Sequence, residues 1–102
     1  MSAPREEQAA GRVRLRARIS GRVQGVGFRW WARDQAERLG LTGWVRNDES
    51  ERAVEVLAEG EAHNLEALEQ VLHSGPPGSR VEQVETWREP PSGEFVAFEI
   101  ER

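Results

Sequence analysis

The sequence contains no cysteine among its 102 residues, and this absence removes a large group of possible chemistries. Disulfide bonds, thiolate nucleophiles and cysteine-rich zinc sites are all excluded. Lysine is also missing, because all 14 basic residues are arginine, so no Schiff base can form on a lysine side chain. The chemistry of the chain must therefore come from other side chains or from the backbone.

Long apolar runs are missing as well. None approaches the roughly 20 residues that a membrane-spanning helix needs, and the first ten residues are too polar for the apolar centre of a secretory signal. We therefore expect a cytoplasmic protein with no membrane partner. The formal net charge is -4 at pH 7, so the overall field disfavours nucleic acid. An anionic ligand must be held by a local group of residues.

The chain is short enough to hold one modest hydrophobic core. Residues 1–11 show no periodicity, so we expect a flexible N-terminal tail there, followed by one domain over residues 12–102. The first strand is predicted over residues 13–19, where apolar residues alternate with arginines. These arginines are Arg14, Arg16 and Arg18. We interpret them as the solvated face of the strand, and a stripe that binds nucleic acid is the alternative.

Apolar residues from Phe28 to Leu39 recur with helical spacing, and Gly40 is a typical stop signal for a helix. We therefore predict a helix of about three turns in this segment. Trp30 and Trp31 near its start are interpreted as packing residues rather than as a stacking platform.

The rest of the chain predicts a hairpin, a second helix and two further strands. These are strands over residues 43–47, 52–59, 81–87 and 94–101, and a helix between Gly60 and Gly75. The order predicts an α+β fold, a ferredoxin-like two-layer sandwich of βαββαβ type with a short terminal strand. We expect an antiparallel sheet that is covered by two helices on one face.

A segment with three glycines, Gly21, Gly25 and Gly27, joins the first predicted strand to the first helix and is followed by Arg29. Glycines permit positive φ angles and close backbone approach, so successive N–H groups can converge on one anion. The start of the helix adds unpaired N–H groups and a partial positive charge. The planar guanidinium of Arg29 can meet two phosphate oxygens at once. The pattern indicates an anion cradle, with a surface loop and a solvated arginine as the alternative.

The residues ISGRVQGVGFR at positions 19–29 closely resemble the first signature of the acylphosphatase family, G-x-V-Q-G-V-x-F-R. The residues GWVRN at positions 43–47 are similar to its second signature, and GPPG at positions 75–78 continues the resemblance. The resemblance extends over about residues 13–102. It implies a hydrolase that cleaves the carboxyl–phosphate bond of acyl phosphates to carboxylate and inorganic phosphate.

The resemblance also implies roles for individual residues. Arg29 binds the phosphate, and Asn47 positions the attacking water. In the inferred fold the first two strands run parallel, so the loop and Asn47 reach the same edge of the sheet; for Asn47 alone, a turn-forming role is the alternative. The loop residues implied to bind phosphate through their backbone are Arg22, Val23, Gln24, Gly25, Val26, Gly27 and Phe28.

The sequence departs from the second signature after Asn47. The family pattern has a glycine four residues later and a valine two residues beyond it, whereas this chain has Glu51 and Ala53 there, with Val54 displaced by one. The turn of the hairpin is therefore predicted to be one residue longer. We expect the extra residue to be absorbed at the tip of the hairpin.

Direct attack of water on phosphorus is the predicted mechanism. Val23 stands where the C-x5-R loop of cysteine phosphatases carries its nucleophile, so a phosphocysteine intermediate is excluded. His63 and His73 lack a metal-ligand pattern, and we expect no metal and no cofactor. By hypothesis, the phosphate of the substrate takes the proton from the water. The expected partners are a small-molecule acyl phosphate and inorganic phosphate, and the chain is expected to be a monomer.

Two other functions fit the same topology. RNA-binding modules share the order of strands and helices, but they carry outward-facing aromatic residues on their central strands, where this chain has arginines. A non-catalytic module that binds phosphate or a metabolite is the second alternative. Turnover of a simple acyl phosphate distinguishes the enzyme from both.

Overall fold

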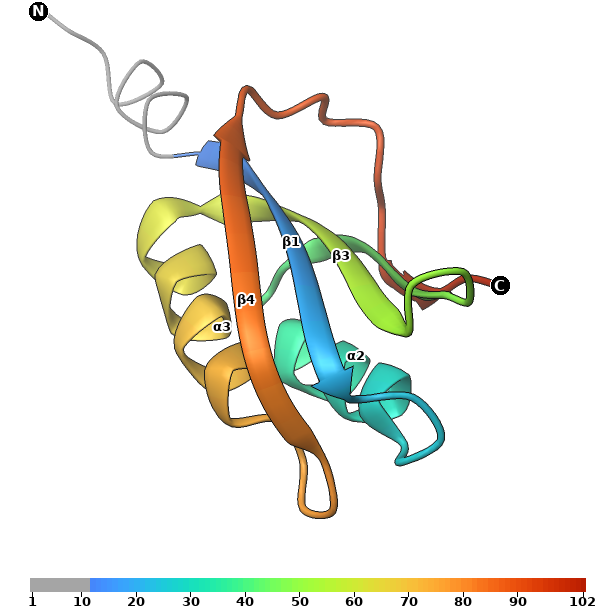
Figure 1. Cartoon of the computed structure of the whole chain (residues 1–102). Helices are drawn as coiled ribbons and strands as arrows, with labels where there is room; N and C mark the ends of the chain where they lie inside the picture. The colour runs from blue at the N-terminus through green and yellow to red at the C-terminus, as the bar shows by residue number, and fades with distance from the viewer. Residues whose placement is uncertain (1–11) are drawn as a thin grey trace, which may run out of the picture.

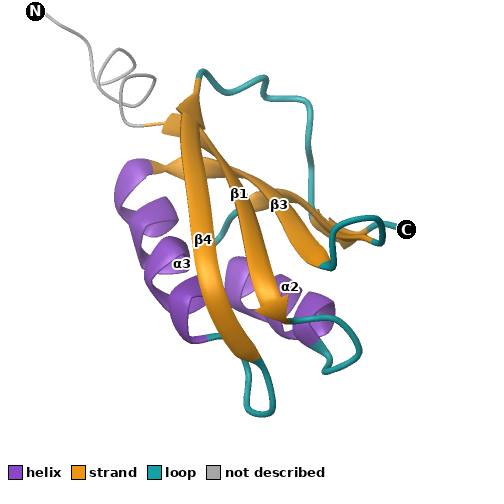
Figure 2. Ribbon diagram, in the orientation of Figure 1, coloured by secondary structure: helices purple, strands orange, loops and turns teal. Residues whose placement is uncertain are grey.

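The computed structural model describes residues 12–102, and the flexible tail predicted over residues 1–11 lies outside the described residues. Both helices lie on the same face of one sheet, as Figure 1 and Figure 2 show. The predicted two-layer α+β sandwich is therefore confirmed. Within the described part, neither helix is long and apolar enough to cross a membrane. The elements are β1 (Arg12–Arg22), α2 (Phe28–Arg38), β2 (Thr42–Asp48), β3 (Ala53–Glu61), α3 (Ala62–Ser74), β4 (Arg80–Glu89) and β5 (Phe98–Ile100).

The five-stranded sheet has the order β4-β1-β3-β2-β5. β1 pairs antiparallel with β3 and β4, and β3 pairs antiparallel with β2. β1 and β2 therefore run in the same direction, as predicted. In the register of the sheet, Ala53 of β3 lies between Ser20 of β1 and Asp48 of β2. The loop after β1 and the turn after β2 thus leave the sheet at the same end.

The terminal strand differs from the prediction. β5 comprises only Phe98–Ile100 and pairs in parallel with β2, so the antiparallel arrangement holds only for the four longer strands. Residues 90–97 cross from the β4 edge of the sheet to the β2 edge instead of forming a strand (Figure 1). In a strand over residues 94–101, Val96 and Phe98 would lie on the same face, but Val96 is 96% exposed, whereas Phe98 is buried. Crossing the width of the sheet thus uses residues 94–97, which the sequence prediction assigns to a strand.

The core lies between the sheet and the two helices. Leu15, Ala17 and Ile19 of β1 are at most 1% exposed, which confirms the predicted alternation. Trp31 packs edge-on against Phe28, with ring centroids 5.2 Å apart, as predicted for a packing residue. Each fully buried large apolar side chain stabilises the fold by roughly 1.5–3 kcal/mol. The helices contribute Phe28, Ala32, Ala36, Leu65, Leu68 and Leu72 to this core.

The opposite face of β1 carries Arg14, Arg16 and Arg18 in ion pairs with carboxylates. Arg14 lies 2.8 Å from Glu59, and Arg18 lies 2.8 Å from Glu55. The side chains of Arg14 and Arg18 are only 16% and 19% exposed. The interpretation as a solvated face is wrong for Arg14 and Arg18, because Glu59 and Glu55 of β3 stand directly opposite them in the sheet. It holds in part for Arg16, whose side chain is 40% exposed and pairs with Glu89 of β4.

Candidate active site

The segment of residues 22–28, which we call the glycine loop, runs from the last residue of β1 to the first residue of α2. Gly25 and Gly27 have φ angles of 74° and 77°, in the left-handed region that residues with side chains rarely adopt. A Cβ atom at either position would meet no described atom within 4 Å, so the backbone conformation, rather than crowding, requires glycine. Left-handed residues in such loops are typical of backbone nests that bind anions.

Helix α2 begins without a side-chain cap. Gly27 occupies the N-cap position, and the first turn contains no acidic residue. No side chain at the helix start therefore satisfies the first N–H groups or offsets the positive end of the helix dipole. Arg29 lies in the same turn, where a cation is unfavourable unless an anion is close. The loop and the helix start together suit an anionic ligand.

Arg29 of α2 and Asn47 of β2 line the same pocket. Within residues 12–102, Arg29 takes part in no ion pair. Its guanidinium is thus available to a ligand in the pocket. The sheet register explains this proximity, because β1 and β2 end side by side across β3.

Asn47 is the second-last residue of β2, and its Oδ1 is buried without a hydrogen-bond partner among the described residues. An unpartnered buried acceptor costs about 1–3 kcal/mol, so it calls for a functional explanation. The neighbouring turn is instead bonded by Asp48, whose Oδ1 accepts hydrogen bonds from the backbone N–H and the hydroxyl of Ser50. A turn-forming role thus belongs to Asp48, and the amide of Asn47 is left for a ligand or a water.

The predicted loop residues do not line the pocket that holds Arg29. Arg22, Val23 and Gln24 line a second pocket. Val23 and Phe28 are 0% and 2% exposed, so their side chains belong to the core. Any contact of these two residues with a ligand must therefore be made by their backbone, which is the role that the resemblance implies.

Other residues that the sequence does not assign to the site also line the Arg29 pocket, and among them are Trp30, Arg33 and Arg102. The guanidinium of Arg33 lies 4.5 Å from the centroid of the Trp30 ring, and Trp30 is 60% exposed. The interpretation of Trp30 as a packing residue is therefore wrong. Arg29 and Arg33 are four residues apart and share one face of α2, and this spacing is the signal that could have identified Arg33.

The turn for which the sequence predicts a one-residue insertion lies between the end of β2 at Asp48 and the start of β3 at Ala53. Arg52 has a φ of 54°, in the region that favours glycine. Counted with one extra residue, Arg52 falls where the family signature has its glycine. Asn47 is paired with Val54 in the sheet, so an extra residue in the turn would leave the pairing of Asn47 intact.

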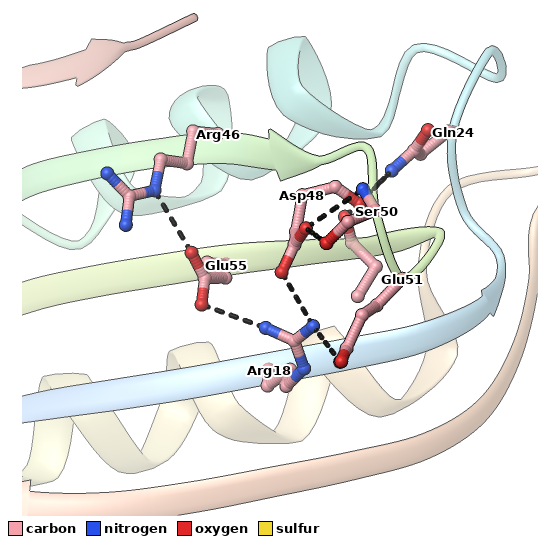
Figure 3. Close-up of polar contacts among 8 residues, drawn as sticks. Arg18, Gln24, Arg46, Asp48, Ser50, Glu51 and Glu55 are labelled. Atoms are coloured by element: carbon pink, nitrogen blue, oxygen red, sulfur yellow. Dashed lines mark hydrogen bonds and ion pairs between the residues drawn. The ribbon is translucent and has the colours of Figure 1, made fainter.

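Ion pairs hold this turn against β1 (Figure 3). Arg18 lies 2.7 Å from Asp48 and also pairs with Glu51 and Glu55. The hydroxyl of Ser50 and the guanidinium of Arg18 together lower the pKa of Asp48 to about 2. The carboxylate of Asp48 is therefore ionised at neutral pH, and its bonds to the turn and to β1 persist there.

Histidine and carboxylate groups are scattered around the fold. Among residues 12–102, no three histidine, aspartate or glutamate side chains lie close enough together to hold a metal ion. His63 and His73 are exposed on α3, and neither lines the Arg29 pocket. The acidic side chains at that pocket, Glu49 and Glu99, are both exposed. The buried polar chemistry of the pocket thus comes from arginine and amide groups.

Comparisons with known proteins identify the family. The model of the family described as Acylphosphatase matches residues 15–100. An acylphosphatase from Pseudomonas paraeruginosa is 55% identical over 89% of this chain and 98% of its own length. One from Rubrobacter xylanophilus is 50% identical over 92% of this chain and 84% of its own length. The structure of an acylphosphatase from Coxiella burnetii superposes with a TM-score of 0.86 at 34% identity, covering 93% of this chain and 98% of that one. The chain belongs to the acylphosphatase family.

Proposed function

We propose that this chain hydrolyses acyl phosphates by direct attack of water on phosphorus, without a metal ion and without a phosphoenzyme intermediate. The family supports the reaction, and one observation supports the assignment of roles. Arg29 and Asn47, which come from different elements, line one pocket next to an uncapped helix start. That arrangement offers a cation and a polar amide in one pocket, close to the free N–H groups of the helix start.

Arg29 holds the phosphate in this proposal. Its planar guanidinium donates two parallel hydrogen bonds to phosphate oxygens, which a lysine cannot do. The N–H groups of the glycine loop and of the first turn of α2 bind the remaining oxygens. Because negative charge spreads over these oxygens in the transition state, donors fixed in advance stabilise it without reorganisation.

Asn47 orients the attacking water. Its buried Oδ1 accepts a hydrogen bond from the water, which directs a lone pair of the water towards phosphorus. A bond forms between the water oxygen and phosphorus, and the bond from phosphorus to the acyl oxygen breaks. The acyl group leaves as a carboxylate, which needs little help from an acid. The proton of the water passes to a phosphate oxygen of the substrate, so no histidine takes part.

Turnover of benzoyl phosphate in the presence of a metal chelator tests the proposal. Hydrolysis that continues with chelator supports a metal-free enzyme. Binding of inorganic phosphate without any turnover of benzoyl phosphate would point to the non-catalytic phosphate-binding module. Loss of turnover on chelation, restored by a divalent cation, would refute the metal-free mechanism.

We also propose that the chain acts as a monomer in the cytoplasm, on a small-molecule acyl phosphate and without nucleic acid. The net charge of -4 supports the absence of a nucleic-acid partner. Light scattering at assay concentrations tests the oligomeric state. A dimeric mass would contradict the proposal.

A further inference from the structure

The side chain of Gln24 connects the glycine loop to the turn between β2 and β3. Its Nε2 donates one hydrogen bond to the carbonyl oxygen of Asp48, at 3.0 Å, and one to that of Ala53, at 2.9 Å. Both hydrogens of the amide are thereby used. Asp48 is the last residue of β2 and Ala53 is the first residue of β3, and the two are paired in register. One side chain of the loop thus holds both ends of the turn, and Figure 3 shows Gln24 reaching from the loop towards the turn.

The backbone that Gln24 holds is directly continuous with Asn47, which precedes Asp48. Because the Oδ1 of Asn47 has no partner among the described residues, no hydrogen bond from the protein to that oxygen sets the direction of the amide. The direction follows from the backbone at the end of β2. Arg18 binds the carboxylate of Asp48, whereas Gln24 binds its carbonyl group. Arg18 therefore fixes the side chain of Asp48, whereas Gln24 fixes its backbone. Of these two contacts, only that of Gln24 comes from the glycine loop.

We propose that Gln24 is a positioning residue, which holds the amide of Asn47 at the correct place relative to the phosphate bound by the loop. This inference rests on the proposed function. Gln24 lines the second pocket and does not line the pocket of Arg29 and Asn47, so it acts through the backbone of Asp48. Misplacement of a catalytic group by about 1 Å is enough to slow a reaction on the order of 100-fold.

The variant Gln24→Met tests the inference, because methionine has a similar length and donates no hydrogen bond. We expect kcat for benzoyl phosphate to fall roughly 10–100-fold. The inhibition constant of inorganic phosphate should change by less than about 3-fold, because Arg29 and the start of α2 are untouched. Gln70→Met is the matched control, since Gln70 is exposed on α3, and we expect its kcat to equal that of the wild type. An unchanged kcat in Gln24→Met would overturn the inference.

The variant Gln24→Glu gives a pH profile that a purely structural role would not produce. An ionised carboxylate repels the two carbonyl oxygens, whereas a protonated one donates a hydrogen bond to one of them. The ratio of its kcat to that of the wild type should therefore rise as the pH falls towards the pKa of the introduced carboxyl group. A ratio that does not change with pH would count against the inference. This profile also decides the matter if circular dichroism shows that Gln24→Met is unfolded.

A double-mutant cycle shows whether Gln24 acts through Asn47. In the Asn47→Ala background, Gln24→Met should lower kcat by less than about 3-fold, because the group that it positions is already absent. The same factor in both backgrounds would overturn the inference. Failure of the proposed function is distinguishable, because it requires a wild type without turnover or an Asn47→Ala variant with full turnover. In either of those cases the inference falls together with the function on which it rests.

Discussion

Glu59 of β3 is a carboxylate that is only 1% exposed, and its replacement by glutamine should destabilise the fold. Its oxygens accept hydrogen bonds from the N–H groups of Ser92 and Gly93, at 2.7 and 3.0 Å, and from the Ser92 hydroxyl, and Arg14 pairs with it at 2.8 Å. Ser92 and Gly93 belong to the segment that crosses the sheet from β4 to β5. Glu59 thus fastens that segment to the middle of the sheet.

The size of the expected loss of stability follows from the pKa of Glu59. Burial alone would raise this pKa, but the N–H groups of Ser92 and Gly93 and the guanidinium of Arg14 outweigh it and lower the pKa from 4.5 to about 2. A depression of that size corresponds to about 3 kcal/mol of stability at neutral pH. Because the pKa is lower in the folded state, this stability is fully present above pH 4.5 and is lost as the pH falls through about 2. Arg14 keeps Glu89 at 3.6 Å after the substitution, so it is not left without a carboxylate.

Urea unfolding of the wild type and of Glu59→Gln, followed by circular dichroism, measures this difference. At pH 7 the free energy of unfolding of the variant should be lower by about 3 kcal/mol, and the difference should shrink as the pH falls from 4.5 towards 2. Glu69→Gln is the control. Its side chain is 29% exposed and pairs with Arg88 at 2.9 Å, and such pairs contribute about 0–1 kcal/mol. Equal stability of Glu59→Gln and Glu69→Gln at pH 7, or a difference that is constant with pH, would refute the reasoning.

Three other variants give separate predictions. Asn47→Ala should lower kcat strongly and leave the inhibition constant of inorganic phosphate almost unchanged; equal losses in both would mean that Asn47 binds the substrate instead. The double variant His63→Ala, His73→Ala should keep the pH profile of kcat, and the loss of one limb of that profile would show that a histidine carries the proton. Arg52→Gly should stabilise the fold by up to about 1 kcal/mol, because an arginine at a φ of 54° is strained by about 1–2 kcal/mol and glycine costs part of that gain in entropy. Thermal unfolding measures that effect, and a lower midpoint would argue against strain at Arg52.

The parts of the fold that were predictable depend on local patterns. Alternation along β1 identified its buried face, and helical spacing from Phe28 together with Gly40 located α2 within a residue of its end. The length of β5 was not predictable in this way. The sequence assigns residues 94–97 to a strand, but they have to cross the sheet to reach β2, and that requirement depends on the final order of the strands.

In the candidate site, too, the residues in local sequence patterns were predictable, whereas those placed by long-range packing were not. Arg29 and Asn47 lie in segments with a recognisable pattern, and the parallel direction inferred for β1 and β2 predicts that both residues lie at one end of the sheet. The contact of Gln24 with Ala53 joins residues that are 29 positions apart, and Arg102 reaches the pocket from the end of the described chain. Such contacts leave no periodic trace in the sequence, because they depend on how the loop and the terminal strand pack.

Inhibition of benzoyl phosphate hydrolysis by inorganic phosphate, compared between the wild type and Arg29→Lys, measures the contribution of Arg29 most directly. Lysine keeps the positive charge and loses the planar pair of donors. We predict that turnover falls by at least about 100-fold and that phosphate inhibits much more weakly, as expected when a bidentate contact to the transition state is lost. Normal turnover with normal phosphate inhibition in Arg29→Lys would show that the phosphate is held elsewhere.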